Sequence, residues 1–322
     1  MGRLPVQRPA TDFVVAAGDI GGLLNGLQCP AINPLYIGTA DAMTNRKLEA
    51  SIHSNLDRNS DYTSYLQLEA VLDAQHPLSD PPHHDEMLFI IQHQVTELWI
   101  KLIIHETEAA IASIRKDDLS PAVKNLARVK HIQTQVYNQW SVLDTLTPSE
   151  YAQFRDVFGK ASGFQSPQYR LLEFLLGNKS VAILKYYEHQ EEWHERLRKV
   201  LFSPSLYEEF LLYLARAGLP VPKAAIERDF SIQREEQAEV VAVFKLIYER
   251  PEKYWAAYEM CEALMDIGNN FQLWRFHHMK TVERIIGHKK GTGGSSGVSF
   301  LKKALDIEFF PELISVRTEI GA

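Results

Sequence analysis

The apolar residues between positions 252 and 287 recur with the period of an α-helix, and this pattern constrains the fold more than any other part of the sequence. They are spaced by three or four residues, which places them on one continuous face of a helix. The members of this stripe are Met260, Leu264, Ile267, Phe271, Trp274, His278, Val282 and Ile285. All are apolar or aromatic except His278, and the adjacent His277 falls about 100° round the helix on a more polar side. We therefore predict a long helix in which His278, rather than His277, faces the core.

The rest of the chain after Tyr62 is also rich in helix-forming residues and contains no alternating strand of useful length. The predicted helices cover residues 62–74, 84–114, 120–142, 148–158, 167–176, 179–201, 205–216, 234–249 and 252–287, with short ones near 298–305 and 310–316. This pattern predicts an all-α fold, a large single-domain helical bundle over residues 57–322. Six of the 17 glycines fall within the first 40 positions, with no regular apolar period. We therefore expect residues 1–56 to form an irregular or disordered N-terminal extension.

Composition excludes several classes of function. The net charge is −7 and the acidic and basic residues are interspersed, which argues against a nucleic-acid surface. No run of 18 or more apolar residues occurs, so we expect no membrane-spanning segment. The two cysteines, Cys29 and Cys261, are far apart in the sequence. They indicate no disulfide framework, and a reducing cytoplasm fits best.

The predicted helix 84–114 carries two apolar faces. One consists of Met87, Ile91, Val95, Leu98 and Leu102, and the other of Phe89, His93, Ile100 and Ile104. A helix that is apolar on two sides is expected to be central and largely buried. Phe89 and His93 lie one turn apart, so their rings project into the same space. Such a pair suits a flat aromatic ligand that carries an N–H group, because the imidazole can accept a hydrogen bond from that group.

The residues alone leave several alternatives open. His278 is either a core histidine bonded to a backbone carbonyl or an axial haem ligand. His93 with Glu97, or the cluster at residues 83–86, allows a protein-ligated metal, although no His-Glu-x-x-His motif occurs and acidic residues are common at helix starts. The composition of the glycine-rich loop 291–297 allows three alternatives, which are a flexible linker, a phosphate-binding loop and an active-site lid.

Six segments, in order, resemble the tryptophan 2,3-dioxygenase family of haem enzymes. They are His84–Trp99, Trp140–Leu143 with Thr147–Tyr151, Ser162–Ser166, Glu173–Asn178, Phe271–Arg275 and Gly291–Gly297. The resemblance runs from about residue 57 to the end of the chain. It implies oxidative opening of the indole C2=C3 bond of L-tryptophan by O₂, giving N-formyl-L-kynurenine, with ferrous haem b as the cofactor.

The resemblance also assigns roles to individual residues. It implies that His278 is the axial ligand of the haem iron, and that His93 orients the substrate and shares in proton movement. It places the substrate-binding residues at Phe89, Ile90, Ile91, Gln92, His93, Tyr151, Arg155 and Thr292. Arg155 would clamp the substrate carboxylate, although from the residues alone a surface ion pair with Glu150 or Asp156 is the simpler reading. Trp140 and Ser162 match positions near the haem.

Members of this family are homotetramers in which an early helix of one subunit lines the pocket of its neighbour. The resemblance implies the same assembly here, with Tyr62, Tyr65 and Leu66 on that helix. Two other functions stay open at this point. One is a haem monooxygenase that hydroxylates a modified tryptophan, and the other is a sensor that binds haem or tryptophan without turnover.

Overall fold

The computed structural model describes residues 49, 51 and 61–321, which belong to two compact units that divide after Leu68. The expected N-terminal extension, residues 1–56, lies outside the described residues except for two positions. In the first unit, helix α1 (Tyr62–Tyr65) begins at Asp61, whose Oδ1 accepts a hydrogen bond from the Ser64 N–H at 2.7 Å. The predicted helix 62–74 is therefore not continuous. Gln67 has a φ of 53°, a left-handed conformation that ends α1 before α2 (Leu68–Leu72) begins.

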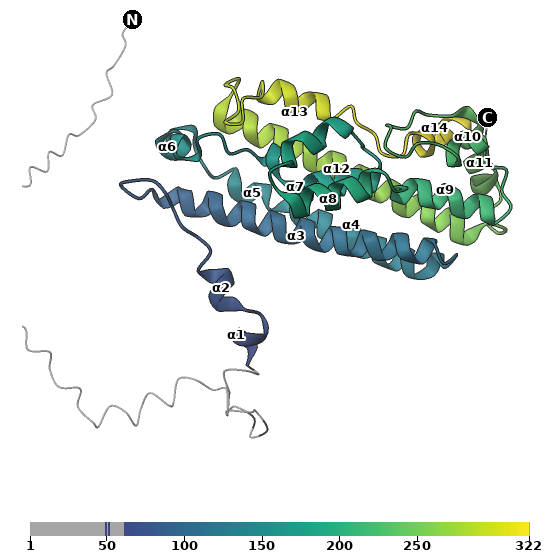
Figure 1. Cartoon of the computed structure of the whole chain (residues 1–322), viewed down its shortest axis with the longest axis horizontal. Coiled ribbons are helices and arrows are strands. Elements are labelled where there is room, and N and C mark those ends of the chain that lie inside the picture. Colours follow the sequence, from purple (N-terminus) through teal and green to yellow (C-terminus); the bar gives the residue numbers. More distant parts are fainter. Residues whose placement is uncertain (1–48, 50, 52–60, 322) are drawn as a thin grey trace, which may run out of the picture. The chain divides into compact units, whose positions relative to one another are not determined.

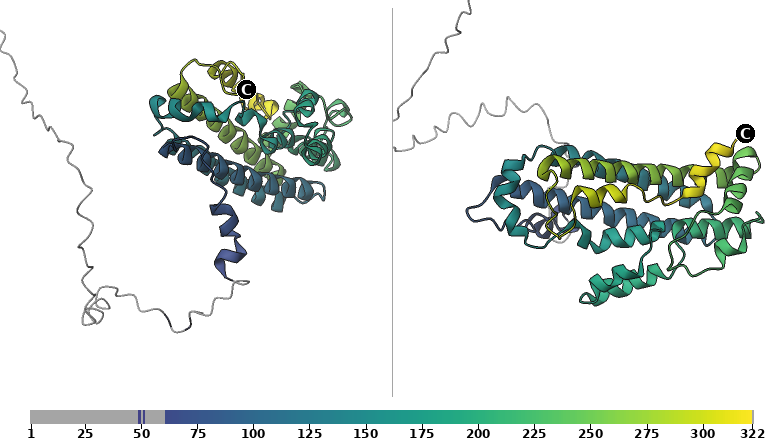
Figure 2. Two further views of the ribbon diagram at one scale, coloured as in Figure 1. Left: turned by 60° about the vertical axis from the view of Figure 1, so that its left-hand side comes forward. Right: turned by 90° about the horizontal axis from the view of Figure 1, so that it is seen from above.

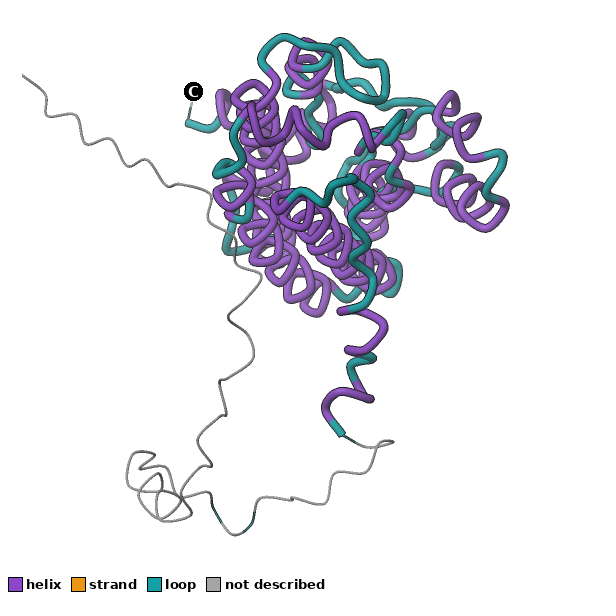
Figure 3. Tube along the Cα trace, turned by 90° about the vertical axis from the view of Figure 1, so that its left-hand side faces the viewer, coloured by secondary structure: helices purple, strands orange, loops and turns teal. Residues whose placement is uncertain are grey.

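Three long helices form the frame of the second unit. They are α3 (His84–Ile114), α4 (Leu119–Asn138) and α12 (Trp255–Ile286). Helix α4 packs against both α3 and α12, and the three lie side by side in Figures 1 and 2. All regular structure in the described residues is helical (Figure 3), so the predicted all-α class is confirmed.

Shorter helices complete the second unit. Five of them pack against α3 or α12, namely α7 (Pro167–Leu176), α9 (Leu206–Arg216), α11 (Ala238–Glu249), α13 (Val298–Ala304) and α14 (Pro311–Glu319). Helix α8 (Glu191–Leu201) packs against α7, and α10 (Lys223–Ile226) packs against α9. The short elements are α5 (Trp140–Leu143), α6 (Pro148–Phe154) and the 3-10 helices η3 (Arg155–Phe158), η4 (Gly163–Gln165) and η5 (Val181–Tyr187). The predicted helices 120–142 and 179–201 are each divided in two, and 234–249 begins only at Ala238.

The apolar stripe of α12 packs into the main core as predicted. Met260, Leu264, Ile267 and Phe271 are buried, whereas His278 near the other end of the helix is only partly buried. Arg275 lies on the adjacent face and is buried as well, where its guanidinium bonds Glu173 of α7 at 3.1 Å. A buried arginine requires such a partner.

Helix α3 differs from the prediction. Its second half is buried, with Ile100, Ile104 and Ile114 at most 4% exposed. In its first half, however, one of the two apolar faces is open. The exposed fractions there are 37% for Met87, 44% for Ile91, 36% for Val95 and 55% for Leu98. The expectation of a helix buried on two sides is therefore wrong for these four residues, which we call the α3 stripe. It is also wrong for His93 on the second face, whose side chain is exposed.

Among the described residues, α3 is also the one helix long and apolar enough to cross a membrane, judged by length and composition alone. The helix packs against α4, α7 and α9, and its second half is buried. Core helices of soluble proteins pass the same test, so this feature is weak support for a membrane span.

Candidate active site

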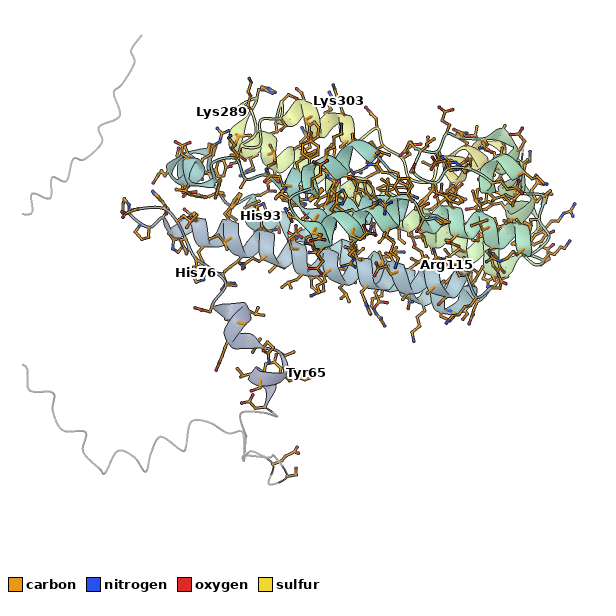
Figure 4. All side chains as sticks on the ribbon, viewed as in Figure 1. Tyr65, His76, His93, Arg115, Lys289 and Lys303 are labelled. Carbon is orange, nitrogen blue, oxygen red and sulfur yellow. The ribbon has the colours of Figure 1, made fainter. Side chains whose placement is uncertain are left out.

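Helices α5 and α6 bring α3 and α12 together at one end of the second unit. Each of these two short helices packs against both α3 and α12. They form a small apolar core that is separate from the main one, built around Trp140, Leu143, Leu146, Phe154 and Ile285. His93 of α3, labelled in Figure 4, and His278 of α12 both lie at this end.

His278 is held between two tryptophan rings. The indole of Trp140 stacks on the imidazole, with ring centroids 4.9 Å apart and planes inclined by 9°, and Trp274 lies at 5.7 Å. In the described part of the chain, His278 has no hydrogen-bond partner. Burial, and then the nearby charge of His93, lower the pKa of His278 to about 4. The imidazole is therefore neutral at neutral pH, the form that binds a metal ion.

The adjacent His277 has a different environment. Its Nε2 lies 3.3 Å from Asp144 Oδ2, and its ring is 5.0 Å from the ring of Tyr137. Thr281, one turn further along α12, donates a hydrogen bond to Asp144 Oδ1 at 2.6 Å. His277 is thus engaged with α5, whereas His278 keeps both ring nitrogens available. The two adjacent histidines therefore differ in their partners, although both side chains are partly buried.

His93 has a defined tautomer. Its Nδ1 lies 2.7 Å from the carbonyl oxygen of Phe89, which can only accept a hydrogen bond, so Nδ1 carries the proton. The lone pair of Nε2 is then free to accept a hydrogen bond. The surrounding protein atoms lower the pKa of His93 by desolvation, although the side chain is exposed at the surface of the single chain. This imidazole is therefore a neutral acceptor at neutral pH.

An aromatic cluster surrounds His93. The Phe89 ring lies 4.2 Å from the His93 ring, 4.6 Å from Phe158 and 5.9 Å from Tyr151. Phe154 is completely buried beneath these rings. The sequence argument did not identify Phe154 and Phe158. Their spacing of three and then four residues after Tyr151 would have indicated one shared helix face.

Arg155 follows directly after α6 and joins this cluster to the glycine-rich loop. One guanidinium nitrogen donates a hydrogen bond to the carbonyl oxygen of Lys290. Among the described residues Arg155 forms no ion pair with Glu150 or Asp156, so the surface-pair reading of Arg155 is not supported. The positive charge of Arg155 also acts on Tyr151, whose pKa is nevertheless raised because its hydroxyl is partly buried.

The loop 291–297 lies against the segment that follows Arg155. The Thr292 hydroxyl donates a hydrogen bond to the Ala161 carbonyl oxygen at 2.6 Å. A Cβ added at Gly293 would lie 2.6 Å from Ser162 Cβ, so only glycine permits this approach. Gly297 has a φ of +66°, and a Cβ there would meet the Lys289 carbonyl oxygen at 2.5 Å. These contacts rule out a free linker, and they bring Thr292, Ser162 and Arg155 together.

Not every predicted site residue lies near the ring cluster. Ile91 belongs to the exposed α3 stripe, and Gln92 is buried, whereas Ile90 is partly buried. Tyr62, Tyr65 and Leu66 lie in the first unit, where their side chains are 73%, 85% and 39% exposed.

The structure gives no support to a metal site made of protein ligands. Within the described residues, no three His, Cys, Asp or Glu side chains are grouped to hold a metal ion. Glu86, from the histidine-rich helix start, instead accepts hydrogen bonds from the backbone N–H groups of Leu78 and Ser79 at 2.7 and 2.9 Å. The acidic side chain therefore has a structural role.

A cavity in the main core is not the site. It is lined by apolar side chains that include Ile103, Leu172 and Trp274, and its volume is about 20 Å³. Sites for small molecules are at least an order of magnitude larger. The arrangement around His93 and His278 therefore remains the candidate active site.

Comparison with known proteins identifies the family of the chain. The family model described as tryptophan 2,3-dioxygenase matches residues 48–205 and 223–320. A protein of Serratia proteamaculans named tryptophan 2,3-dioxygenase is 57% identical over 280 residues, which cover 87% of this chain and all of the relative. Proteins of the same name from Kineococcus radiotolerans and an Arthrobacter species are each 55% identical, and the matches cover 88% and 86% of this chain and 99% and 97% of those relatives.

Proposed function

Because the chain belongs to the tryptophan 2,3-dioxygenase family, we propose that it opens the indole C2=C3 bond of L-tryptophan with O₂ and releases N-formyl-L-kynurenine. The protein is on this basis an oxidoreductase of the dioxygenase class that acts in tryptophan breakdown. The observation that carries the proposal is the pairing of two neutral imidazoles, His93 and His278, at one end of the helical frame.

The residues around His278 fit a haem group. His278 offers an unpartnered neutral imidazole, which is a donor that haem iron binds. Trp140 and Trp274 give it apolar aromatic walls. His278 would therefore hold haem b, with Trp140 and Ser162 near it. When bound, the haem would supply the ferrous iron at which O₂ is activated.

His93 and Phe89 would orient the indole. The free lone pair on His93 Nε2 would accept the indole N–H, while the Phe89 ring would lie against the flat face or edge of the substrate. A neutral acceptor at this position can also take up a proton as the ring opens. Tyr151 and Phe158 would exclude water from the aromatic part of the pocket.

Arg155 and Thr292 would bind the amino-acid part of the substrate. A guanidinium carries five N–H donors, so Arg155 keeps several for a carboxylate while one bonds Lys290. The Thr292 oxygen donates its proton to Ala161 and keeps lone pairs that can accept a hydrogen bond from the substrate ammonium. Under this proposal the loop 291–297 is a lid that recognises the substrate and closes over it.

We also propose that the protein is a cytoplasmic homotetramer. The α3 stripe of four exposed apolar side chains is typical of a surface that another protein covers. Tyr62, Tyr65 and Leu66 would then line the pocket of a neighbouring subunit.

Mass spectrometry of the product tests the reaction. Reduced, haem-loaded protein mixed with L-tryptophan and O₂ should give a product heavier than tryptophan by two oxygen atoms. A gain of one oxygen would indicate the monooxygenase alternative, which the names of the relatives do not favour. No product from any indole, despite a change in the haem spectrum on addition of tryptophan, would indicate a sensor.

A further inference from the structure

Helix α5 touches α12 at two points that lie one helical turn apart. The first is the stack between Trp140 and His278. The second is Asp144, the residue that ends α5, whose two carboxylate oxygens contact His277 at 3.3 Å and Thr281 at 2.6 Å. His277 and Thr281 are four residues apart on α12, and His278 lies between them. The carboxylate therefore bridges the turn of α12 that presents His278.

The contact to Thr281 is the stronger of the two. The Thr281 side chain is 1% exposed, so its hydroxyl has no competing water, and a hydrogen bond to a carboxylate is short and strong. The contact to His277 is longer, and the side chains of His277 and Asp144 are each about a quarter exposed. Together they restrain the turn of α12 that carries His278 against α5. The plane of the His278 ring against Trp140 depends on that placement, because no hydrogen bond of its own holds the imidazole.

We propose that Asp144 is a positioning residue for the haem-binding histidine, acting through Thr281 and His277 and not by contact with the substrate. This inference rests on the proposed haem ligation by His278. Groups that surround a ligating histidine commonly set its orientation, and their removal costs roughly 10- to 100-fold in affinity. Here the positioning group acts on the residues either side of the ligand rather than on the ligand's own ring.

The test measures haem loss and the iron–histidine bond in the haem-loaded protein. Haem loss is followed as transfer to an excess of a haem-free globin, and the bond is followed by the resonance Raman band of the ferrous iron–histidine stretch. Asp144→Ala should release haem roughly 10- to 100-fold faster and shift the Raman band. Asp144→Asn should stay within about threefold of the wild type, because its amide oxygen still accepts the Thr281 hydroxyl.

Asp266 provides a matched control. It also lies on α12 and ties that helix to α4 through an ion pair with Lys130 at 2.6 Å, but it is three turns from His278. Asp266→Ala should leave haem loss and the Raman band unchanged. Thr281→Val removes only a hydroxyl, and it should shift the band in the same direction as Asp144→Ala even if the alanine variant folds poorly.

Three results would overturn the inference. Haem loss and a Raman band that are unchanged in both Asp144→Ala and Thr281→Val would show that the bridge does not position His278. An equal effect of Asp266→Ala would show that any anchor of α12 acts in the same way. A wild-type chain that takes up no haem would overturn the proposed function together with this inference, whereas the first two results leave the proposed function intact.

Discussion

Two adjacent histidines on α12 differ in what their ring nitrogens touch, and this difference determines which one can serve as a ligand. His277 Nε2 lies 3.3 Å from Asp144 Oδ2, while His278 stacks on Trp140 and has no hydrogen-bond partner in the described part of the chain. We predict that His278→Ala does not retain haem through gel filtration, whereas His277→Ala does. The ratio of Soret to protein absorbance after the column is the measurement. Haem retained by His278→Ala and lost by His277→Ala would reverse the assignment.

One guanidinium nitrogen of Arg155 donates a hydrogen bond to the Lys290 carbonyl oxygen, and the other donors remain for the carboxylate of the proposed substrate. We predict that Arg155→Ala raises the KM for L-tryptophan roughly 10- to 100-fold, because a charged hydrogen-bond pair is lost. Arg155→Lys should recover only part of that loss, since an ammonium cannot make the two-pronged contact. Steady-state kinetics give both values, and an unchanged KM in the alanine variant would place Arg155 outside the pocket.

The pKa of His93 sets the pH range in which it can accept a proton or an N–H group. Burial lowers this pKa below the usual 6.5, while the Phe89 carbonyl and the charge of Glu97 act in the opposite direction. A lowered pKa means that His93 stays neutral as the pH falls to 6.5 and becomes protonated only below that value. We predict that kcat/KM is flat from pH 8 to 6.5 and then declines, by about tenfold for each unit below the pKa.

His93→Gln tests whether this acid limb belongs to His93. Glutamine keeps a hydrogen-bond acceptor but does not titrate, so its lower kcat/KM should show no decline of that kind over the same range. Circular dichroism at each pH separates unfolding from titration. An identical acid limb in both proteins would assign it to another group.

At the scale of the elements, the glycine-rich loop illustrates what a sequence leaves undecided. Its composition allowed a linker, a phosphate cradle or a lid, because glycine and serine suit all three. The contacts of Thr292 with Ala161 and of Gly293 with Ser162 favour the lid, since they join residues about 130 positions apart. Such a contact leaves no local pattern, so only the folded chain or the family resemblance could reveal it.

Gly293→Ala should disturb this contact. The new Cβ would lie 2.6 Å from Ser162 Cβ, and neither backbone can move far without breaking the Thr292 bond. We predict that KM for tryptophan rises about tenfold while haem retention is unchanged, because a displaced loop misplaces a substrate contact. Gly163→Ala adds the same methyl group nearby with nothing within 4 Å, so it should behave like the wild type. Equal kinetics for the two variants would argue against the lid.

The helices show where periodicity is a sufficient guide and where it fails. It predicted α12 correctly and most of its buried face, because α12 packs against several helices of the same chain and Met260, Leu264, Ile267, Phe271 and Ile285 are buried. In α3 the same kind of stripe is exposed between Met87 and Leu98. Periodicity shows that a face is apolar, but it does not show whether that face is covered by the same chain. The break of the first predicted helix at Gln67 depends on a single left-handed residue, which periodicity cannot detect.

At the scale of the whole molecule, the α3 stripe is the clearest reason to expect an assembly. Burying one aliphatic side chain of this size stabilises an interface by roughly 1.5–3 kcal/mol, and a symmetric contact repeats each burial on both partners. Leu98 is the most exposed member, at 55%. A glutamate at that position would place an unpaired charge in the interface, which is strongly unfavourable.

We predict that the wild-type protein has four times the mass of a single chain in light scattering, and that Leu98→Glu shifts it to smaller species. Ile232→Glu is the control, because Ile232 is similarly exposed, at 59%, but lies outside the stripe.

If Tyr62, Tyr65 and Leu66 of a neighbour line the pocket, Leu98→Glu should also lose tryptophan affinity while retaining haem. Under the proposed function His278 holds haem within one chain, so the two properties should separate. A dissociated Leu98→Glu variant with unaltered KM would show that each pocket is complete within its own subunit.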